Sequence, residues 1–188
     1  MTNKFLAVVA FLMAFSCVCV GQSKASDSED QYKLLATTKT STMQKELNKT
    51  SAKGFRVIVG APTRGSEMAV FLSRDGTVDE PYRYKLLATT RTSTMQKELN
   101  EQAATGYRLI PSTMVAKKSL FGGDEIVMIM ELPPKVKKRY VYKLLATNRT
   151  RTLQKEVTEA KDEGYKLVGM VSRDEHMVVM EREIDLAP

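Results

Sequence analysis

The stretch YKLLATTRTSTMQKELN, residues 84–100, occurs three times in this chain and decides how its fold is interpreted. Residues 32–48 repeat it with one difference, Lys39 in place of Arg91. Residues 142–158 read YKLLATNRTRTLQKEVT and match the middle copy at twelve of its seventeen positions. A glycine and an aromatic residue follow each copy at Gly54-Phe55, Gly106-Tyr107 and Gly164-Tyr165. Self-similarity at a period of about 50 residues indicates a repeat architecture.

Each copy predicts a first strand, a helix and two further strands. YKLLAT predicts the strand, and Met43 and Leu47, four residues apart, predict one apolar face of a helix over residues 42–53. Ser41 and Gln44 have the spacing of a capping box, in which both side chains satisfy the first N–H groups of a helix. Ser93 and Gln96 repeat this spacing, whereas the third copy has Arg151 in place of the serine, which moves the expected cap to Thr150 or Thr152. The glycine after each helix predicts a left-handed C-terminal cap.

The last strands of the second and third repeats indicate how the repeats pack. Residues 126–130 (IVMIM) and 177–180 (MVVM) are continuously apolar, a pattern typical of strands that are covered on both faces. We expect one face to carry the helix of its own repeat and the other to meet a neighbouring repeat. The predicted fold class is therefore α+β, with three tandem β-α-β-β repeats packed into one pseudo-threefold assembly.

The remaining segments predict the boundaries of these repeats. Turn-forming and proline-containing stretches separate the copies. The predicted organisation is a signal peptide (1–25), a disordered leader (26–31), repeat 1 (32–74), a linker (75–83), repeat 2 (84–132), a linker (133–139), repeat 3 (140–183) and a tail (184–188).

The first 25 residues predict export to the periplasm or the extracellular space. Lys4 precedes an apolar run of about 16 residues, and Ser23-Lys24-Ala25 resembles a signal-peptidase site. The run is shorter than the roughly 20 residues that span a bilayer, so we expect no transmembrane segment in the mature chain. An alternative is a lipoprotein in which Cys17 is lipidated. Because both cysteines lie in this segment, the mature chain is predicted to contain no disulfide, thiolate metal site or cysteine nucleophile.

The chain carries a net charge of +7. Without Lys4 and Lys24, 27 basic and 22 acidic residues remain, which leaves +5. Such a charge is compatible with binding to anionic envelope polymers or lipid headgroups, or with a contribution to solubility alone. Export argues against nucleic acid as a partner.

The repeat unit resembles the small bacterial domain family DUF4177. The residues that carry the resemblance are YKLL at 142–145, LQKEV at 153–157, GYKLV at 164–168 and the apolar strand at 177–182. The family's usual tryptophan is replaced by Phe55, Tyr107 and Tyr165. The resemblance implies a β-α-β-β fold and no particular activity.

The corner between the first strand and the helix is the candidate binding site in each repeat. Hydroxyl groups and one or two cations gather there beside the helix N-terminus, a combination that suits a phosphate, sulfate or carboxylate. The predicted anion-binding residues are Lys39, Ser41, Thr42, Arg91, Ser93, Thr94, Arg149, Arg151 and Thr152. The alternative is that the hydroxyl residues only cap helices and the cations are solvated.

Other polar residues carry less specific signals. His176, the single histidine, is expected in an exposed hairpin, and Glu46, Glu98 and Glu156 are expected on solvated helix faces. The lysines of residues 135–138 are either solvated or contact an anionic surface. The sequence contains no nucleophile elbow, P-loop, dinucleotide fingerprint or zinc spacing, so we predict no cofactor and no metal.

These observations predict an exported, non-enzymatic binding or scaffolding protein. Its partner would be an anionic ligand, an envelope polymer, another protein or a second copy of the chain. The alternatives are an enzyme that uses Asp and Glu on envelope polysaccharide, and a purely structural envelope protein.

Overall fold

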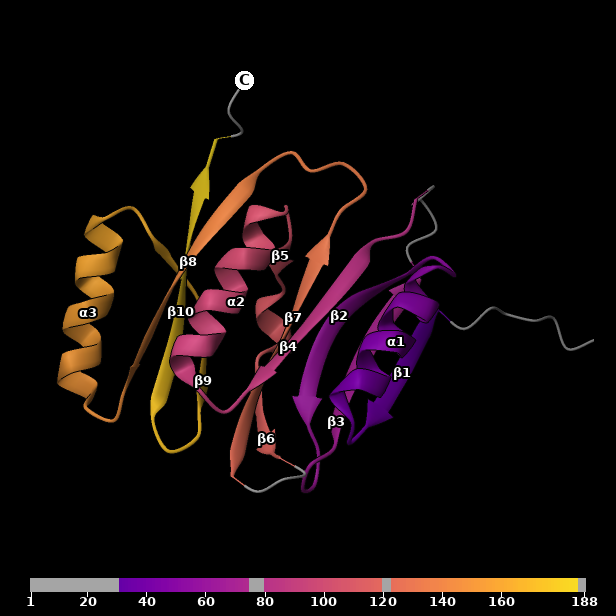
Figure 1. Cartoon of the computed structure of the whole chain (residues 1–188), viewed down its shortest axis with the longest axis horizontal. Helices are drawn as coiled ribbons and strands as arrows, with labels where there is room; N and C mark the ends of the chain where they lie inside the picture. The colour runs from indigo at the N-terminus through magenta and orange to yellow at the C-terminus, as the bar shows by residue number, and fades with distance from the viewer. Residues whose placement is uncertain (1–30, 75–79, 120–122, 186–188) are drawn as a thin grey trace, which may run out of the picture.

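The computed structural model describes residues 31–74, 80–119 and 123–185, which form a mixed α+β structure with three helices and three antiparallel sheets (Figure 1). The predicted signal peptide, Cys17, nearly all of the leader and the end of the tail lie outside the described residues. Half of the first linker, residues 75–79, does so too.

Each unit has a first strand, a helix and two or three further strands. Unit 1 contains β1 (Tyr32–Thr37), α1 (Thr40–Ser51), β2 (Phe55–Pro62) and β3 (Met68–Arg74). Unit 2 contains β4 (Arg83–Thr89), α2 (Thr92–Ala104), β5 (Arg108–Leu109), a 3-10 turn η1 (Pro111–Thr113), β6 (Val115–Lys118) and β7 (Asp124–Leu132). Unit 3 contains β8 (Arg139–Thr147), α3 (Thr150–Asp162), β9 (Lys166–Ser172) and β10 (His176–Ile184).

The last strand of each unit lies in the middle of its sheet. The strand orders are β1-β3-β2, β4-β7-β5 and β8-β10-β9, and β6 also pairs with β7. All these pairs are antiparallel. The two strands that flank each helix therefore run parallel, with the last strand between them. Pro111 begins the 3-10 turn that separates β5 from β6, because proline has no N–H to donate to the ladder.

The predicted capping boxes are wrong. The helices begin at Thr40, Thr92 and Thr150, two residues before the expected start in the first repeat. The N-cap residues are Lys39, Arg91 and Arg149, and none of them makes a side-chain capping bond. Ser41 and Ser93 therefore lie within the first helical turn, and Thr150 and Thr152 do not cap the third helix.

The glycines after the helices adopt the predicted conformation. Gly54, Gly106 and Gly164 have φ angles of 84°, 98° and 89°, which residues with a Cβ rarely adopt. At Gly106 a Cβ would also come within 2.8 Å of Val136 Cγ2, because the second linker crosses close to this turn.

The strands β7 and β10 are covered on both faces, as their apolar sequences predict. On β7, Val127 and Ile129 belong to the core that contains the α1 residue Leu47. Met128 and Met130 belong to the core that surrounds α2. On β10, Met177 and Val179 join that second core, whereas Val178 and Met180 pack with α3. Each helix except α3 is thus enclosed between its own sheet and the back of the next one.

Side-chain amides of α1 and α2 bind each of these helices to the edge of the following sheet. Gln44 of α1 donates from Nε2 to the carbonyl of Tyr84 (2.8 Å) and accepts from the N–H of Leu86 (2.7 Å). Asn48 Oδ1 accepts from the N–H of Tyr84 (3.0 Å). Gln44 therefore bonds β4 instead of capping its own helix. These bonds satisfy backbone N–H and C=O groups on the outer edge of β4.

The junction between units 2 and 3 has the same arrangement. Gln96 bonds the carbonyl of Tyr142 (2.8 Å) and the N–H of Leu144 (2.6 Å). Asn100 accepts from the N–H of Tyr142 (2.8 Å) and donates to its carbonyl (3.0 Å). Two successive junctions therefore use the same residues of the repeat.

The three units form a row. Figure 1 shows α3 at one end of the row and β1 at the other, with α2 between α1 and α3. The predicted pseudo-threefold packing is not confirmed by this arrangement, because a threefold assembly needs α3 beside β1.

A basic pocket between the repeats

An arginine and a glutamate join units 1 and 2 next to a tyrosine ring. Arg56 of β2 donates to Glu131 of β7 through Nη2 (2.7 Å) and Nε (3.2 Å). Its guanidinium carbon lies 4.4 Å from the centre of the Tyr82 ring. The hydrogen bonds to Glu131 raise the pKa of Arg56, so this group stays charged and its orientation is fixed.

Units 2 and 3 are joined in the same way. Arg108 donates to Glu181 through Nη2 (2.8 Å) and Nε (3.2 Å), and it lies 4.4 Å from the centre of the Tyr140 ring. The Tyr142 hydroxyl donates to Glu181 (2.9 Å) and accepts from the N–H of Leu109 (2.8 Å). Burial raises the pKa of Tyr142, since the phenolate would lose its hydration.

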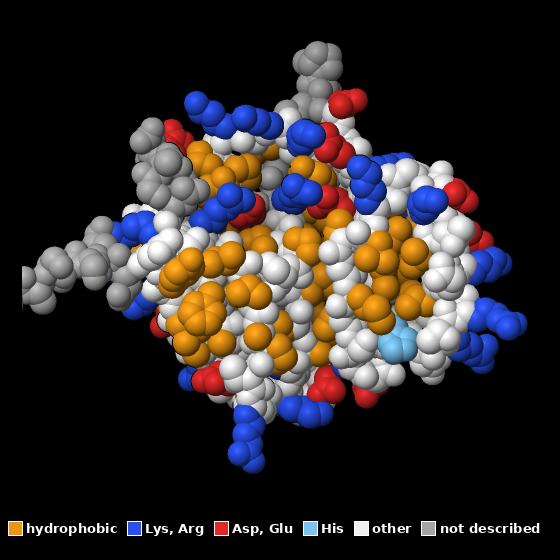
Figure 2. Space-filling model, turned by 180° about the vertical axis from the view of Figure 1, so that it is seen from behind, with side chains coloured by type: hydrophobic (Ala, Val, Ile, Leu, Met, Phe, Trp, Pro, Cys, Tyr) orange, Lys and Arg blue, Asp and Glu red, His pale blue; other side chains and the backbone are white. Residues whose placement is uncertain are grey.

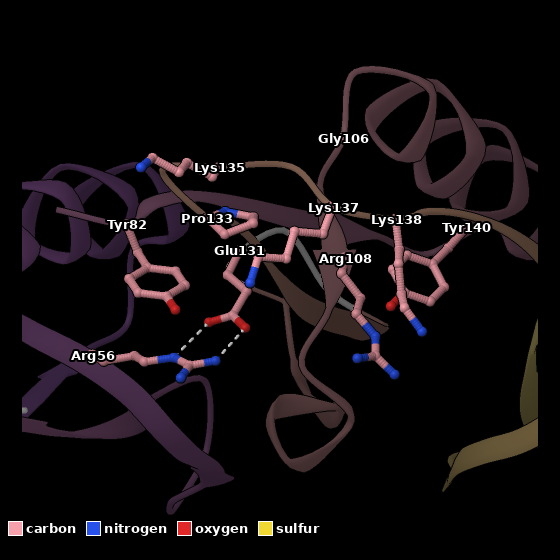
Figure 3. Close-up of a pocket in the computed structure, with 10 residues that line it drawn as sticks. All are labelled: Arg56, Tyr82, Gly106, Arg108, Glu131, Pro133, Lys135, Lys137, Lys138 and Tyr140. Carbon is pink, nitrogen blue, oxygen red and sulfur yellow. Dashed lines mark hydrogen bonds and ion pairs between the residues drawn. The ribbon is translucent and has the colours of Figure 1, made fainter. Parts of the chain in front are cut away.

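A pocket of about 300 Å³ lies between these two arginines. Figure 3 shows Arg56 and Tyr82 on one side of it, Arg108 and Tyr140 on the other, and Glu131 between them. Gly106 and Pro133 complete part of its wall, and three lysines of the second linker (Lys135, Lys137 and Lys138) also line it. The lining therefore holds five cationic side chains and one carboxylate.

The lysines give this pocket its excess of positive charge. Lys138 pairs with Glu183 (2.7 Å), and this hydrogen bond raises the pKa of Lys138. Within the described residues, Lys135 and Lys137 have no carboxylate partner. Figure 2 shows several Lys and Arg side chains along one rim of the molecule. Two ammonium groups are consequently available to an anion that enters the pocket.

The predicted anion corners lie elsewhere. The N-termini of the three helices point to the same edge of the molecule (Figure 1), but the structure does not bring them together into one site. The side chains of Lys39, Arg91, Arg149 and Arg151 are exposed. Ser41, Ser93 and Thr152 are exposed as well, and Thr42 and Thr94 are partly buried.

Carboxylates accompany all three corners; at the third, Asp174 and Glu175 line a hollow with Thr147 and Asn148. A hollow of about 220 Å³ at the first corner is lined by residues 38–41 together with Lys117 and Glu125, which pair at 2.9 Å. At the second corner, Thr92 donates to Glu175 (3.0 Å). These carboxylates oppose an incoming anion, so the corners are weaker candidates than the basic pocket.

The remaining candidate residues do not form a second site. His176 is partly buried at the start of β10, with Nδ1 3.0 Å from Ser172 Oγ. Glu46, Glu98 and Glu156 are partly buried on three separate helices. In the described parts of the chain, no three His, Cys, Asp or Glu side chains group as metal ligands. None of the helices described here is long and apolar enough to cross a membrane.

The arginines and tyrosines of the basic pocket were not predicted from the sequence. Only the linker lysines were singled out there, because Arg56 and Glu131 are 75 positions apart. The available signal was the recurrence of Arg56 and Arg108 directly after the Gly-aromatic pair.

The chain matches no protein-family model, no curated protein and no solved structure. The resemblance to DUF4177 therefore stays a prediction.

Proposed function

We propose that this protein is an exported, non-enzymatic binding module for anionic groups, with its site in the basic pocket between the repeats. The observation that carries the proposal is the lining of five cations and one carboxylate. The two arginines are held by carboxylates and aromatic rings, so they lose little conformational entropy on binding. Phosphate, sulfate or carboxylate groups of an envelope polymer have the chemistry that fits.

The relation between the units belongs to the same proposal. We take the three units as successive members of an open array, with the basic pocket formed where the linker of residues 133–138 crosses the junctions. A carboxylate-dependent enzyme is the less favoured candidate, because Glu131 in the pocket is hydrogen-bonded to Arg56 and is the single acidic group of the lining.

The test is thermal unfolding of residues 26–188 with phosphate, sulfate and a sulfated polysaccharide at matched ionic strength. A ligand that prefers the folded state raises the unfolding midpoint. We expect a rise that is lost in the double variant Lys135→Ala and Lys137→Ala. The matched control is Lys45→Ala with Lys49→Ala, two exposed helix lysines whose removal changes the net charge equally.

A third variant separates the pocket from the corners. Lys39→Ala, Arg91→Ala and Arg149→Ala together remove the cation at each helix N-cap. The proposal predicts that this variant keeps the anion-dependent rise. If it loses the rise while the linker variant keeps it, the site is at the corners and the pocket proposal is wrong.

A further inference from the structure

The exposed apolar side chains belong to the first and last units of the row. Among the described residues, the large exposed hydrophobic side chains of unit 1 are Tyr32, Leu34, Ile58, Val59 and Phe71, and those of unit 3 are Leu167, Met170 and Ile184. Unit 2 has none. Figure 2 shows hydrophobic side chains gathered toward each end of this face, with others between them. The terminal repeats of an array usually have polar outer faces, so these apolar ends need an explanation.

Two exposed residues of unit 1, Tyr32 and Phe71, correspond to residues that are buried at the internal junctions. Tyr32 is 56% exposed, whereas its equivalents Tyr84 and Tyr142 are 2% and 3% exposed. Phe71 pairs with Leu34 as Ile129 pairs with Leu86 in unit 2. Phe71 is 45% exposed, but Ile129 is fully buried against the core around α1. The back of the first sheet therefore resembles a junction surface that no helix of the described residues covers.

The other end shows the complementary half of the junction. Leu167 of β9 follows Gly164 at the same distance as Leu109 follows Gly106. Leu109 is 2% exposed and donates its N–H to Tyr142 of the next unit, whereas Leu167 is 55% exposed. Gln154 corresponds to Gln44 and Gln96, yet its amide reaches only Thr158 on its own helix, at 3.5 Å. Unit 3 thus has the helix face and strand that would receive another first strand.

We propose that the chain associates head to tail with a second copy of itself, the sheet of unit 1 packing on α3 and β9 of the partner. This inference is independent of the anion proposal. The contact would repeat the internal junctions, with the partner's YKLLAT strand bound by Gln154. Because the two surfaces differ, the interface is heterologous and generates open chains or a closed ring.

Two positions make this contact weaker than the internal junctions. Ser73 lies opposite Tyr32, where Glu131 and Glu181 lie opposite Tyr84 and Tyr142. Lys166 takes the place of Arg56 and Arg108 in unit 3. With Ser73 at this position, Lys166 would have no carboxylate of the partner to pair with. Thr158 occupies the place of Asn48 and Asn100 in the repeat. Association is accordingly expected to be reversible.

Sedimentation velocity of residues 26–188, which include every described residue, tests the proposal. We expect the mean mass to rise with concentration between about 1 µM and 1 mM, the range of reversible contacts. Phe71→Glu blocks the first end and Leu167→Glu blocks the second, so each variant should remain monomeric. Their equimolar mixture should form a dimer and nothing larger, because one intact end of each kind remains. Ile184→Glu lies at the end of β10, outside the proposed contact of α3 and β9, and should behave as the wild type.

Placing the residues of the internal junctions at positions 73 and 158 gives a gain-of-function test. Ser73→Glu with Thr158→Asn should tighten association at least about tenfold, a change of about 1.4 kcal/mol. Circular dichroism of each variant at low concentration confirms that it is folded. A monomeric wild type over the whole range overturns the proposal. So does self-association of either blocked variant, a mixture that stays monomeric, or a restored variant that associates no better than wild type.

Discussion

Replacing the same glutamine in each repeat should have three different effects on stability. Gln44→Ala removes the donor to the Tyr84 carbonyl and the acceptor for the Leu86 N–H. In Gln96→Ala, the Tyr142 carbonyl keeps its bond from Asn100, so only the Leu144 N–H loses its partner. A partly buried backbone group without a partner costs about 1–3 kcal/mol.

These contacts set the expected order of the three variants. We expect Gln44→Ala to lower the free energy of unfolding by about 2–3 kcal/mol and Gln96→Ala by about 1–2 kcal/mol. Alanine has a slightly higher helix propensity than glutamine, which offsets a few tenths of a kcal/mol in every variant. Gln154 is exposed and contacts no following strand, so Gln154→Ala should change stability by less than about 0.5 kcal/mol.

Urea unfolding followed by far-ultraviolet circular dichroism measures these differences. The protein should be kept at a few µM, so that association between copies does not add to stability. The slopes of the transitions should agree among the variants, which shows that the unfolded states are comparable. Equal losses in all three variants, or a loss at Gln154 as large as that at Gln44, would refute the role of these amides at the junctions.

Two further predictions use the same matched positions. Ile129→Ala leaves a cavity at a fully buried site between the sheet of unit 2 and α1 and should lower the free energy of unfolding by about 2–5 kcal/mol. Phe71→Ala, at the exposed equivalent in unit 1, should lower it by less than about 1 kcal/mol. Urea unfolding of the two variants measures both values. Burial raises the pKa of Tyr142, so the folded protein keeps the phenolic proton above pH ~10, where the unfolded chain loses it. The contribution of this neutral phenol to the free energy of unfolding is constant below pH ~10. Above that pH it falls by about 1.4 kcal/mol per pH unit. Tyr142→Phe should make the alkaline loss shallower by that amount, whereas Tyr32→Phe at an exposed position should leave stability unchanged; identical alkaline slopes for wild type and Tyr142→Phe would contradict this.

Much of each unit could be predicted from local sequence. The three copies of one stretch give the order of elements, and the glycines after the helices give their left-handed ends. The continuous apolar runs of β7 and β10 predicted that both faces of these strands are covered, because such runs are typical of strands buried on both sides. The helix starts were wrong: Lys39, Arg91 and Arg149 are the N-cap residues, and Gln44 makes two hydrogen bonds to β4 instead of capping its own helix.

The basic pocket and the free ends depend on the packing of one unit against the next. Arg56, Glu131 and the linker lysines come together only when β2, β7 and residues 133–138 meet. The sequence by itself determined that YKLLAT forms a strand in every repeat, because that propensity is local. It could not determine that Tyr84 is buried and Tyr32 is exposed, since the residues that follow them are the same. Only the tertiary structure decides this, because a helix precedes β4 in the row and the described chain places none before β1.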